Sequence, residues 1–199
     1  MVPESPALFL TATAAIGWLI AYVLNGWRQD RTKRLQIELD HSSAQMKDFY
    51  APLVALTDQL NTTADINDTM VAGKSPDESG VVSGLVYDQF FLPIHEEINA
   101  ILKSNVHLLE GRVMPESFAA YFRHYTAEEV YRSLTARGQD VSNVRVPGYP
   151  PEFYHDVRKG YMDVIARYED SLQELRERRW FFRFGGLNLF DKAGSRKAS

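Results

Sequence analysis

Residues 35–60 read LQIELDHSSAQMKDFYAPLVALTDQL, and this stretch decides the fold because its apolar residues recur at alternating three- and four-residue spacings. Such spacing places side chains on one face of an α-helix. The face consists of Leu35, Leu39, Met46, Phe49, Leu53, Leu56 and Leu60, with Ser42 as its polar member. We expect one face of an intramolecular bundle here; the alternative is a parallel coiled-coil dimer over about three and a half heptads.

Pro52 interrupts the backbone hydrogen bonding of this predicted helix. A proline has no amide hydrogen, and its ring crowds the carbonyl group four residues earlier. The sequence therefore predicts a helix kink at Pro52, within the segment Phe49-Tyr50-Ala51-Pro52-Leu53.

An apolar run precedes this helix. Residues 7–24 read ALFLTATAAIGWLIAYVL and contain no charged residue. As a helix rising about 1.5 Å per residue, the run would span roughly 27 Å, close to the hydrocarbon core of a bilayer. Within an anchor region at 1–27, the sequence predicts an uncleaved transmembrane helix over 6–26. A signal peptide is the alternative, but no basic residue precedes the run and no typical cleavage site follows it.

Basic residues flank only one end of this run. Those that follow it are Arg28, Arg31, Lys33 and Arg34. The positive-inside rule then predicts an N-terminus outside the cell and a cytoplasmic domain attached to the cell (inner) membrane. Trp27 is placed as an interfacial anchor, and residues 28–60 continue as a juxtamembrane stalk and first bundle helix.

Small residues recur every four positions in the apolar run, at Thr13, Gly17 and Ala21. A stripe of small side chains lets two helix backbones approach closely in a membrane. It predicts self-association or contact with a protein partner through the membrane helix. The alternative is the ordinary abundance of small residues in membrane helices.

The rest of the chain predicts the remaining bundle helices. Residues 61–84 are rich in Asn, Thr, Asp, Ser and Gly and predict a flexible loop. Helical periodicity resumes over 85–180, with short connections at 111–115 and 138–150 that favour antiparallel neighbours. The predicted fold class is all-α, a single N-terminal transmembrane helix followed by an antiparallel four-helix bundle.

An arginine/aromatic tail is predicted over residues 181–199. The residues expected at the membrane interface lie just before its start and within its first positions: Arg179, Trp180, Phe181, Phe182 and Arg183. Such a segment can lay its rings at the headgroup level and pair its arginines with anionic lipid. We expect it to contact the membrane interface; docking on a partner and packing over the end of the bundle are the alternatives.

Composition and motifs exclude several function classes. The chain has no cysteine, which rules out disulfides, thiolate metal sites and a cysteine nucleophile. Its net charge of -4 argues against a general nucleic-acid binder. It contains no Gly-x-Ser-x-Gly elbow, phosphate-binding loop, dinucleotide fingerprint or His-Glu-x-x-His motif. The sequence therefore predicts no enzyme activity, no catalytic residue and no cofactor.

The histidines give only a weak metal signal. Carboxylate-bridged sites in helical bundles use two Glu-x-x-His units, whereas this chain has one, from Glu152 to His155. Further ligands could come from His95-Glu96-Glu97, from His107 with Glu110, or from His124 with Glu128, but none of these repeats the motif. The expectation is surface or hydrogen-bonded histidines without a metal.

These features predict a non-enzymatic interaction or assembly module at the cytoplasmic membrane face, with the lipid bilayer and proteins as partners. One alternative is a transmembrane sensor or effector, for example a defence or signalling component, whose continuous anchor–stalk helix transmits a state. A bundle metalloprotein is the less favoured alternative.

Overall fold

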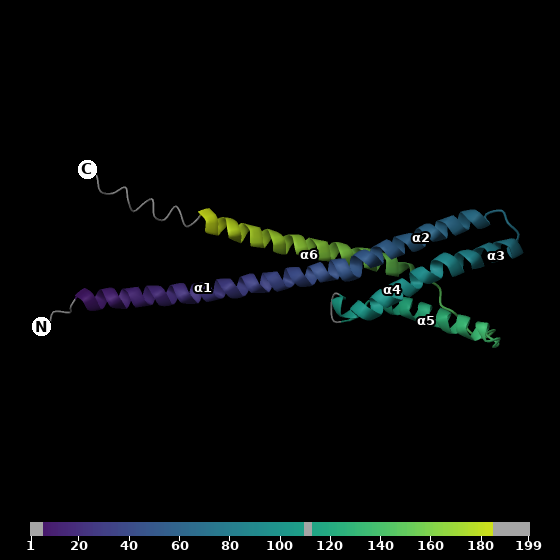
Figure 1. Ribbon diagram of the computed structural model, residues 1–199, viewed down its shortest axis with the longest axis horizontal. Helices are drawn as coiled ribbons and strands as arrows, with labels where there is room; N and C mark the ends of the chain where they lie inside the picture. The colour runs from purple at the N-terminus through teal and green to yellow at the C-terminus, as the bar shows by residue number, and fades with distance from the viewer. Residues whose placement is uncertain (1–5, 110–112, 185–199) are drawn as a thin grey trace. The chain divides into compact units, whose positions relative to one another are not determined.

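The computed structural model describes residues 6–109 and 113–184, and in these ranges every regular element is helical. Side chains are described for residues 15–109 and 113–177. The helices form four long runs, which confirms the all-α class and the helical bundle (Figure 1). The chain divides into two compact units, one of residues 41–167 and one that combines residues 1–40 with 168–199.

The first run passes Pro52 without ending. It consists of α1 (Pro6–Ala44), a π-helical segment η1 (Gln45–Tyr50) and α2 (Ala51–Val71). The amide of Ala51 donates to the carbonyl of Met46, five residues earlier, as π-helical geometry requires. The kink at Pro52 stays a prediction.

In an α-helix the amide of residue 52 would donate to the carbonyl of Asp48, four residues earlier, and a proline has no amide hydrogen to donate. The side-chain amide of Asn105 donates to this carbonyl at 3.0 Å. A side chain from the second run therefore replaces the hydrogen bond that the proline removes.

The predicted flexible loop over residues 61–84 is wrong in extent. Helix α2 continues to Val71 and α3 (Pro76–Val86) follows, so that only residues 72–75 connect them. The polar composition misled the prediction because threonines such as Thr62 donate to carbonyls one turn earlier inside the helix.

The connection at 72–75 is a tight turn with its own signals. Gly73 takes a positive φ of 77°, which favours glycine. Ser75 then caps α3 in a capping box with Glu78, in which each side chain accepts from the other residue's backbone amide. The Ser75 hydroxyl and, more weakly, the Ser75 amide donate to the Glu78 carboxylate, and these two hydrogen bonds lower the pKa of Glu78.

The second run repeats the arrangement of the first. Helix α3 passes through a π-helical segment η2 (Tyr87–Phe91) into α4 (Leu92–Asn105) and a final 3-10 turn η3 (Val106–Leu108). Pro93 lies at the second position of α4, as Pro52 does in α2. A π-helical segment thus precedes each of these two prolines.

The third and fourth runs begin where their prolines predict. Helix α5 (Glu116–Ala136) follows Pro115 and ends before Gly138, whose φ is 68°. Helix α6 (Pro151–Phe184) extends past its expected end, so residues 181–184 of the predicted tail are helical. The remainder of that tail lies outside the described residues.

The unit of residues 41–167 has one apolar core to which all four runs contribute. Its buried members are Phe49, Tyr50, Leu53, Leu56, Leu60, Ile94, Ile98, Leu102, Leu108, Phe118, Tyr121, Phe153, Val157 and Val164. In Figure 1, α2 and the α3–α4 run lie side by side within this unit and run in opposite directions.

The other unit is built on α1 and α6. Leu35, Leu39 and Ser171 are buried there. Arg31 Nη2 lies 3.0 Å from Glu174 Oε1, which joins the two helices by an ion pair. Because α1 leads into the bundle and α6 leads out of it, the two helices are antiparallel.

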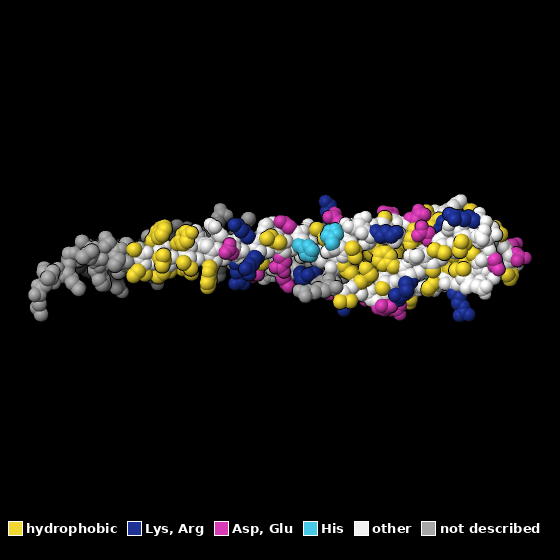
Figure 2. All heavy atoms as spheres, turned by 90° about the horizontal axis from the view of Figure 1, so that it is seen from below, with side chains coloured by type: hydrophobic (Ala, Val, Ile, Leu, Met, Phe, Trp, Pro, Cys, Tyr) yellow, Lys and Arg dark blue, Asp and Glu magenta, His cyan; other side chains and the backbone are white. Residues whose placement is uncertain are grey.

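Within the described part of the chain, no helix has a stretch long and apolar enough to cross a membrane. The transmembrane helix predicted at 6–26 is helical as part of α1 but gains no support as a span. The side chains of residues 7–14, the first part of the apolar run, lie outside the described residues. Those of the second part are exposed (Figure 2), and the large ones up to residue 27 are Ile16, Trp18, Leu19, Ile20, Tyr22, Val23, Leu24 and Trp27.

Candidate functional site

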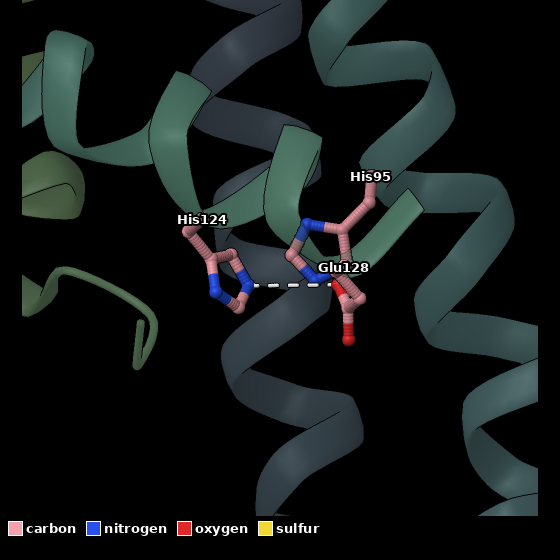
Figure 3. Close-up of side chains that lie close together, drawn as sticks. All are labelled: His95, His124 and Glu128. Carbon is pink, nitrogen blue, oxygen red and sulfur yellow. Dashed lines mark ion pairs between the residues drawn. The ribbon is translucent and has the colours of Figure 1, made fainter. Parts of the chain in front are cut away.

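Two histidines and a glutamate come together between α4 and α5 (Figure 3). His95 comes from α4, while His124 and Glu128 come from α5, one helical turn apart on the same face. One nitrogen or oxygen atom of each residue lies within 4.8 Å of those of the other two. Only 5% of His95 and 8% of His124 is exposed, so this polar cluster adjoins the core.

The hydrogen bond of His124 decides its tautomer. Its Nδ1 lies 2.6 Å from the carbonyl oxygen of Pro147. A carbonyl oxygen can only accept, so Nδ1 carries a hydrogen. In the neutral ring Nε2 then carries the lone pair, and this atom lies 3.7 Å from Glu128 Oε2. Metal-binding histidines have this arrangement, with the second ring nitrogen donating to a backbone carbonyl.

His95 is held by Tyr121. The tyrosine hydroxyl lies 2.9 Å from His95 Nδ1 and 3.4 Å from the backbone carbonyl of the same residue. When the hydroxyl donates to this carbonyl, Nδ1 donates to the hydroxyl oxygen and Nε2 carries the lone pair. When the hydroxyl donates to Nδ1, Nε2 carries the hydrogen. In both cases Nε2 is the ring atom left for other partners.

Burial keeps His95 neutral. Removal from water, together with the nearby His124, lowers the pKa of His95 to about 4. The ring therefore carries no charge at neutral pH, which is the form that binds metals. Burial also raises the pKa of Tyr121 above its ordinary value, so that its hydroxyl keeps its proton.

Tyr149 completes the ring packing around the histidines. Its ring centroid lies 6.1 Å from that of His95 and 6.0 Å from those of His124 and Tyr121. The hydroxyl of Tyr149 is buried and has no hydrogen-bond partner among the described residues. Leaving a buried polar group without a hydrogen-bond partner costs about 1–3 kcal/mol, so this hydroxyl lowers the stability of the fold.

The Glu-x-x-His unit singled out in the sequence does not join this cluster. Glu152 and His155 are both exposed on the first turns of α6. Sequence reasoning did pair His124 with Glu128 but missed their proximity to His95. The available signal was that His95 lies between the buried residues Ile94 and Ile98, on the face where α4 meets the core.

The predicted membrane-contacting residues are only partly described. Gly17, Ala21 and Trp27 are exposed on α1, as are the four basic residues that follow the apolar run. The side chain of Thr13 and those of residues 179–183 lie outside the described residues. The predicted roles of all these residues stay predictions.

No protein-family model, curated protein or solved structure matches this chain. The cluster is therefore interpreted from its own chemistry. Two imidazole nitrogens and a carboxylate can either form a closed hydrogen-bonded network or supply three ligands to a divalent metal ion.

Proposed function

We propose that this protein is a membrane-anchored helical bundle that acts as a non-enzymatic interaction or assembly module at the cytoplasmic face of the cell membrane. The observation that carries the proposal is the antiparallel pair formed by α1 and α6, joined by the ion pair of Arg31 with Glu174. This pair brings the predicted anchor and the predicted arginine/aromatic segment into one unit of the chain.

The register of the pair supports two membrane contacts at one level. Residue 24, the end of the apolar run, lies seven residues before Arg31. Residue 181 lies seven residues after Glu174, in the same direction along the antiparallel pair. Both positions are helical, and each lies about 10 Å along its helix from the ion pair. The end of the apolar run and residues 179–183 therefore fall at the same height along the two helices.

The exposed apolar side chains of residues 16–27 also support an anchor. Trp18, Leu19 and Ile20 are consecutive, so they point about 100° apart around the helix. Tyr22, Val23 and Leu24 are also consecutive and exposed, and they point in a similar set of directions one turn later. A helix that is apolar all round belongs in a protein core or a membrane, and water-exposed apolar patches of this extent are uncommon on soluble proteins.

The partners in this proposal are the lipid bilayer and other proteins. The basic residues after the apolar run place the bundle on the cytoplasmic side. Thr13, Gly17 and Ala21 would form the contact with a second membrane helix, either of another copy or of a partner. The remaining bundle surface would hold or assemble partners near the membrane.

Alkaline carbonate extraction of isolated membranes tests the anchor. We expect the full chain to stay in the membrane pellet. Ile16→Arg should move a large fraction into the supernatant, because an arginine at the centre of the predicted span opposes insertion by about 2.5–3.5 kcal/mol. Ile37→Arg is the matched control, since Ile37 is also an exposed isoleucine of α1 but lies beyond the run. A full chain that is fully extracted by carbonate contradicts the proposal.

Purification in mild detergent tests the role as an interaction module. We expect other proteins to co-purify with the full chain in a constant ratio. The amount of these proteins recovered per chain should fall when residues 181–199 are deleted or when Gly17 is changed to Leu. A chain that purifies alone and monomeric under conditions that keep membrane complexes intact argues against an assembly role.

A second candidate is a transmembrane sensor or effector. It is favoured by the helical path from Pro6 to Val71, which continues through the π-helical segment η1. A π-helical turn can convert to an α-helical turn and shift one residue, which would pass a displacement along the helix. Because the chain has no cysteine, single cysteines placed along α1 give a clean cross-linking readout. A cross-linking pattern that is identical in resting and stressed cells argues against this candidate.

A further inference from the structure

We propose that His95, His124 and Glu128 bind one divalent transition-metal ion of the Zn²⁺ class, which ties α4 to α5. This site goes beyond the proposed role at the membrane. The inference starts from the ligand set, because two imidazoles and one carboxylate form a known three-residue set for Zn²⁺ with a fourth position left to water or another oxygen.

The separations suit such an ion after small side-chain adjustments. Zn²⁺ binds histidine nitrogens and carboxylate oxygens at about 2.0–2.2 Å in tetrahedral geometry, so neighbouring ligand atoms lie about 3.3–3.5 Å apart. His124 Nε2 and Glu128 Oε2 are 3.7 Å apart, and all three ligand atoms fall within 4.8 Å of one another. Rotations about side-chain bonds of the glutamate and the histidines can close the remaining distance.

The surroundings orient both imidazoles for this task. The Pro147 carbonyl accepts from Nδ1 of His124, and the Tyr121 hydroxyl engages Nδ1 of His95. Each histidine is thus held at Nδ1 by a group outside the ligand set and offers Nε2 to the cluster. Such partners fix the ring orientation and raise the basicity of the ligating nitrogen.

The site is also largely enclosed by the protein. Only 5% of His95 and 8% of His124 is exposed, so a bound ion would be largely shielded from water. Tyr149, whose buried hydroxyl lacks a partner among the described residues, has its ring 6.0 Å from that of His124. The Tyr149 ring therefore helps to shield the site from water.

Titration of the metal-stripped full chain in mild detergent with ZnCl₂ tests the proposal. Calorimetry should give one Zn²⁺ per chain with a dissociation constant in the micromolar range or below. Co²⁺ should give the intense visible absorption of tetrahedral coordination. The midpoint of thermal unfolding should rise with the free zinc concentration, because an ion that binds only the folded state stabilises it. The proposal is overturned if the titration shows no stoichiometric binding of zinc to the chain.

Matched substitutions locate the site. His124→Gln and Glu128→Gln should each weaken zinc binding by at least about 100-fold, and Tyr121→Phe by about 10-fold through loss of orientation. The controls are His155→Gln and Glu152→Gln, which alter the exposed Glu-x-x-His unit and should leave zinc binding unchanged. The assignment is refuted if His124→Gln and Glu128→Gln still bind zinc with wild-type affinity, or if the control variants lose zinc binding.

Two further measurements separate this result from others. Circular dichroism without metal should show that Glu128→Gln keeps the helical content of the wild-type chain, since glutamine has nearly the same size and shape as glutamate. Carbonate extraction does not depend on zinc. A negative zinc titration therefore does not contradict the membrane anchor, and extraction of the chain by carbonate does not contradict the metal site.

Discussion

The ring of Tyr50 lies directly against the backbone of α6 at Gly160. A Cβ atom added at Gly160 would meet Tyr50 Cε1 first and would lie 2.7 Å from Cζ and 2.9 Å from the hydroxyl oxygen. These separations are too short for any side chain. Glycine in a helix interior costs about 0.5–1 kcal/mol relative to alanine, and here its absence of a side chain admits an aromatic ring of the core.

Gly160→Ala should destabilise the fold by about 1–3 kcal/mol, because the buried Tyr50 ring has to move. Chemical unfolding followed by circular dichroism measures the change. Gly84→Ala is the control, since Gly84 is also helical but has open space around it; it should be neutral or slightly stabilising. In a Tyr50→Ala background, Gly160→Ala should lose its cost, and an unchanged cost there would disprove the contact.

Asn105→Ala should lower the free energy of unfolding by about 0.5–1.5 kcal/mol, because it leaves the Asp48 carbonyl without its donor. The same substitution in a Pro52→Ala background should cost less, since an alanine at that position has an amide that can donate to the Asp48 carbonyl. Equal costs in both backgrounds would show that Asn105 does not compensate for the proline.

Gln45→Ala should be among the more damaging polar substitutions. The buried Gln45 donates from Nε2 to the Leu108 carbonyl at 2.7 Å and accepts from Arg167 Nη2 at 3.2 Å. Its removal should cost about 2–3 kcal/mol in unfolding free energy, because a buried carbonyl is left unsatisfied. Gln36→Ala, at an exposed site of α1, is the comparison and should change stability by less than about 0.5 kcal/mol.

Stability without metal should fall on acidification because of His95. Its pKa is about 4 in the folded chain and ordinarily 6.5, so the unfolded chain binds more protons between these values. The stabilising contribution is complete above pH 6.5 and is lost as the pH falls towards 4. A pKa lowered from 6.5 to about 4 corresponds to a total of about 3 kcal/mol.

Urea unfolding at pH 7 and pH 4.5 measures this loss. His95→Gln should reduce the difference between the two pH values, whereas His155→Gln at an exposed position should not. The groups that face the His95 ring are Tyr121, His124, Glu128 and Tyr149, and neither substitution alters them. An equal pH dependence in wild type and His95→Gln would show that His95 does not resist protonation.

The helical runs could be predicted because their signals are local. Apolar spacing identified the face from Leu35 to Leu60, and the prolines at 115 and 151 marked helix starts. The face differs from the prediction at one position: Met46 is only partly buried against the core, and the neighbouring Gln45 is fully buried. The π-helical segment shifts the phase there, and three–four spacing assumes an unbroken α-helix.

The polar cluster could not be predicted because it depends on how two helices meet. His124 and Glu128 share a helix face, which sequence spacing reveals. The approach of His95 depends on the packing of α4 against α5, and the orientation of His124 depends on a carbonyl in the connection before α6. The predicted loop at 61–84 failed for the opposite reason, because its polar residues are satisfied inside the helix.

The π-helical segments before Pro52 and Pro93 have a consequence for how this chain should be compared with its relatives. A turn that spans five residues instead of four holds one extra residue without breaking the helix. A relative that lacks either proline could lack one residue in the same turn and keep the core on both sides in register. Sequence alignments should therefore allow single-residue gaps at 45–50 and 87–91, inside helices where gaps are ordinarily penalised.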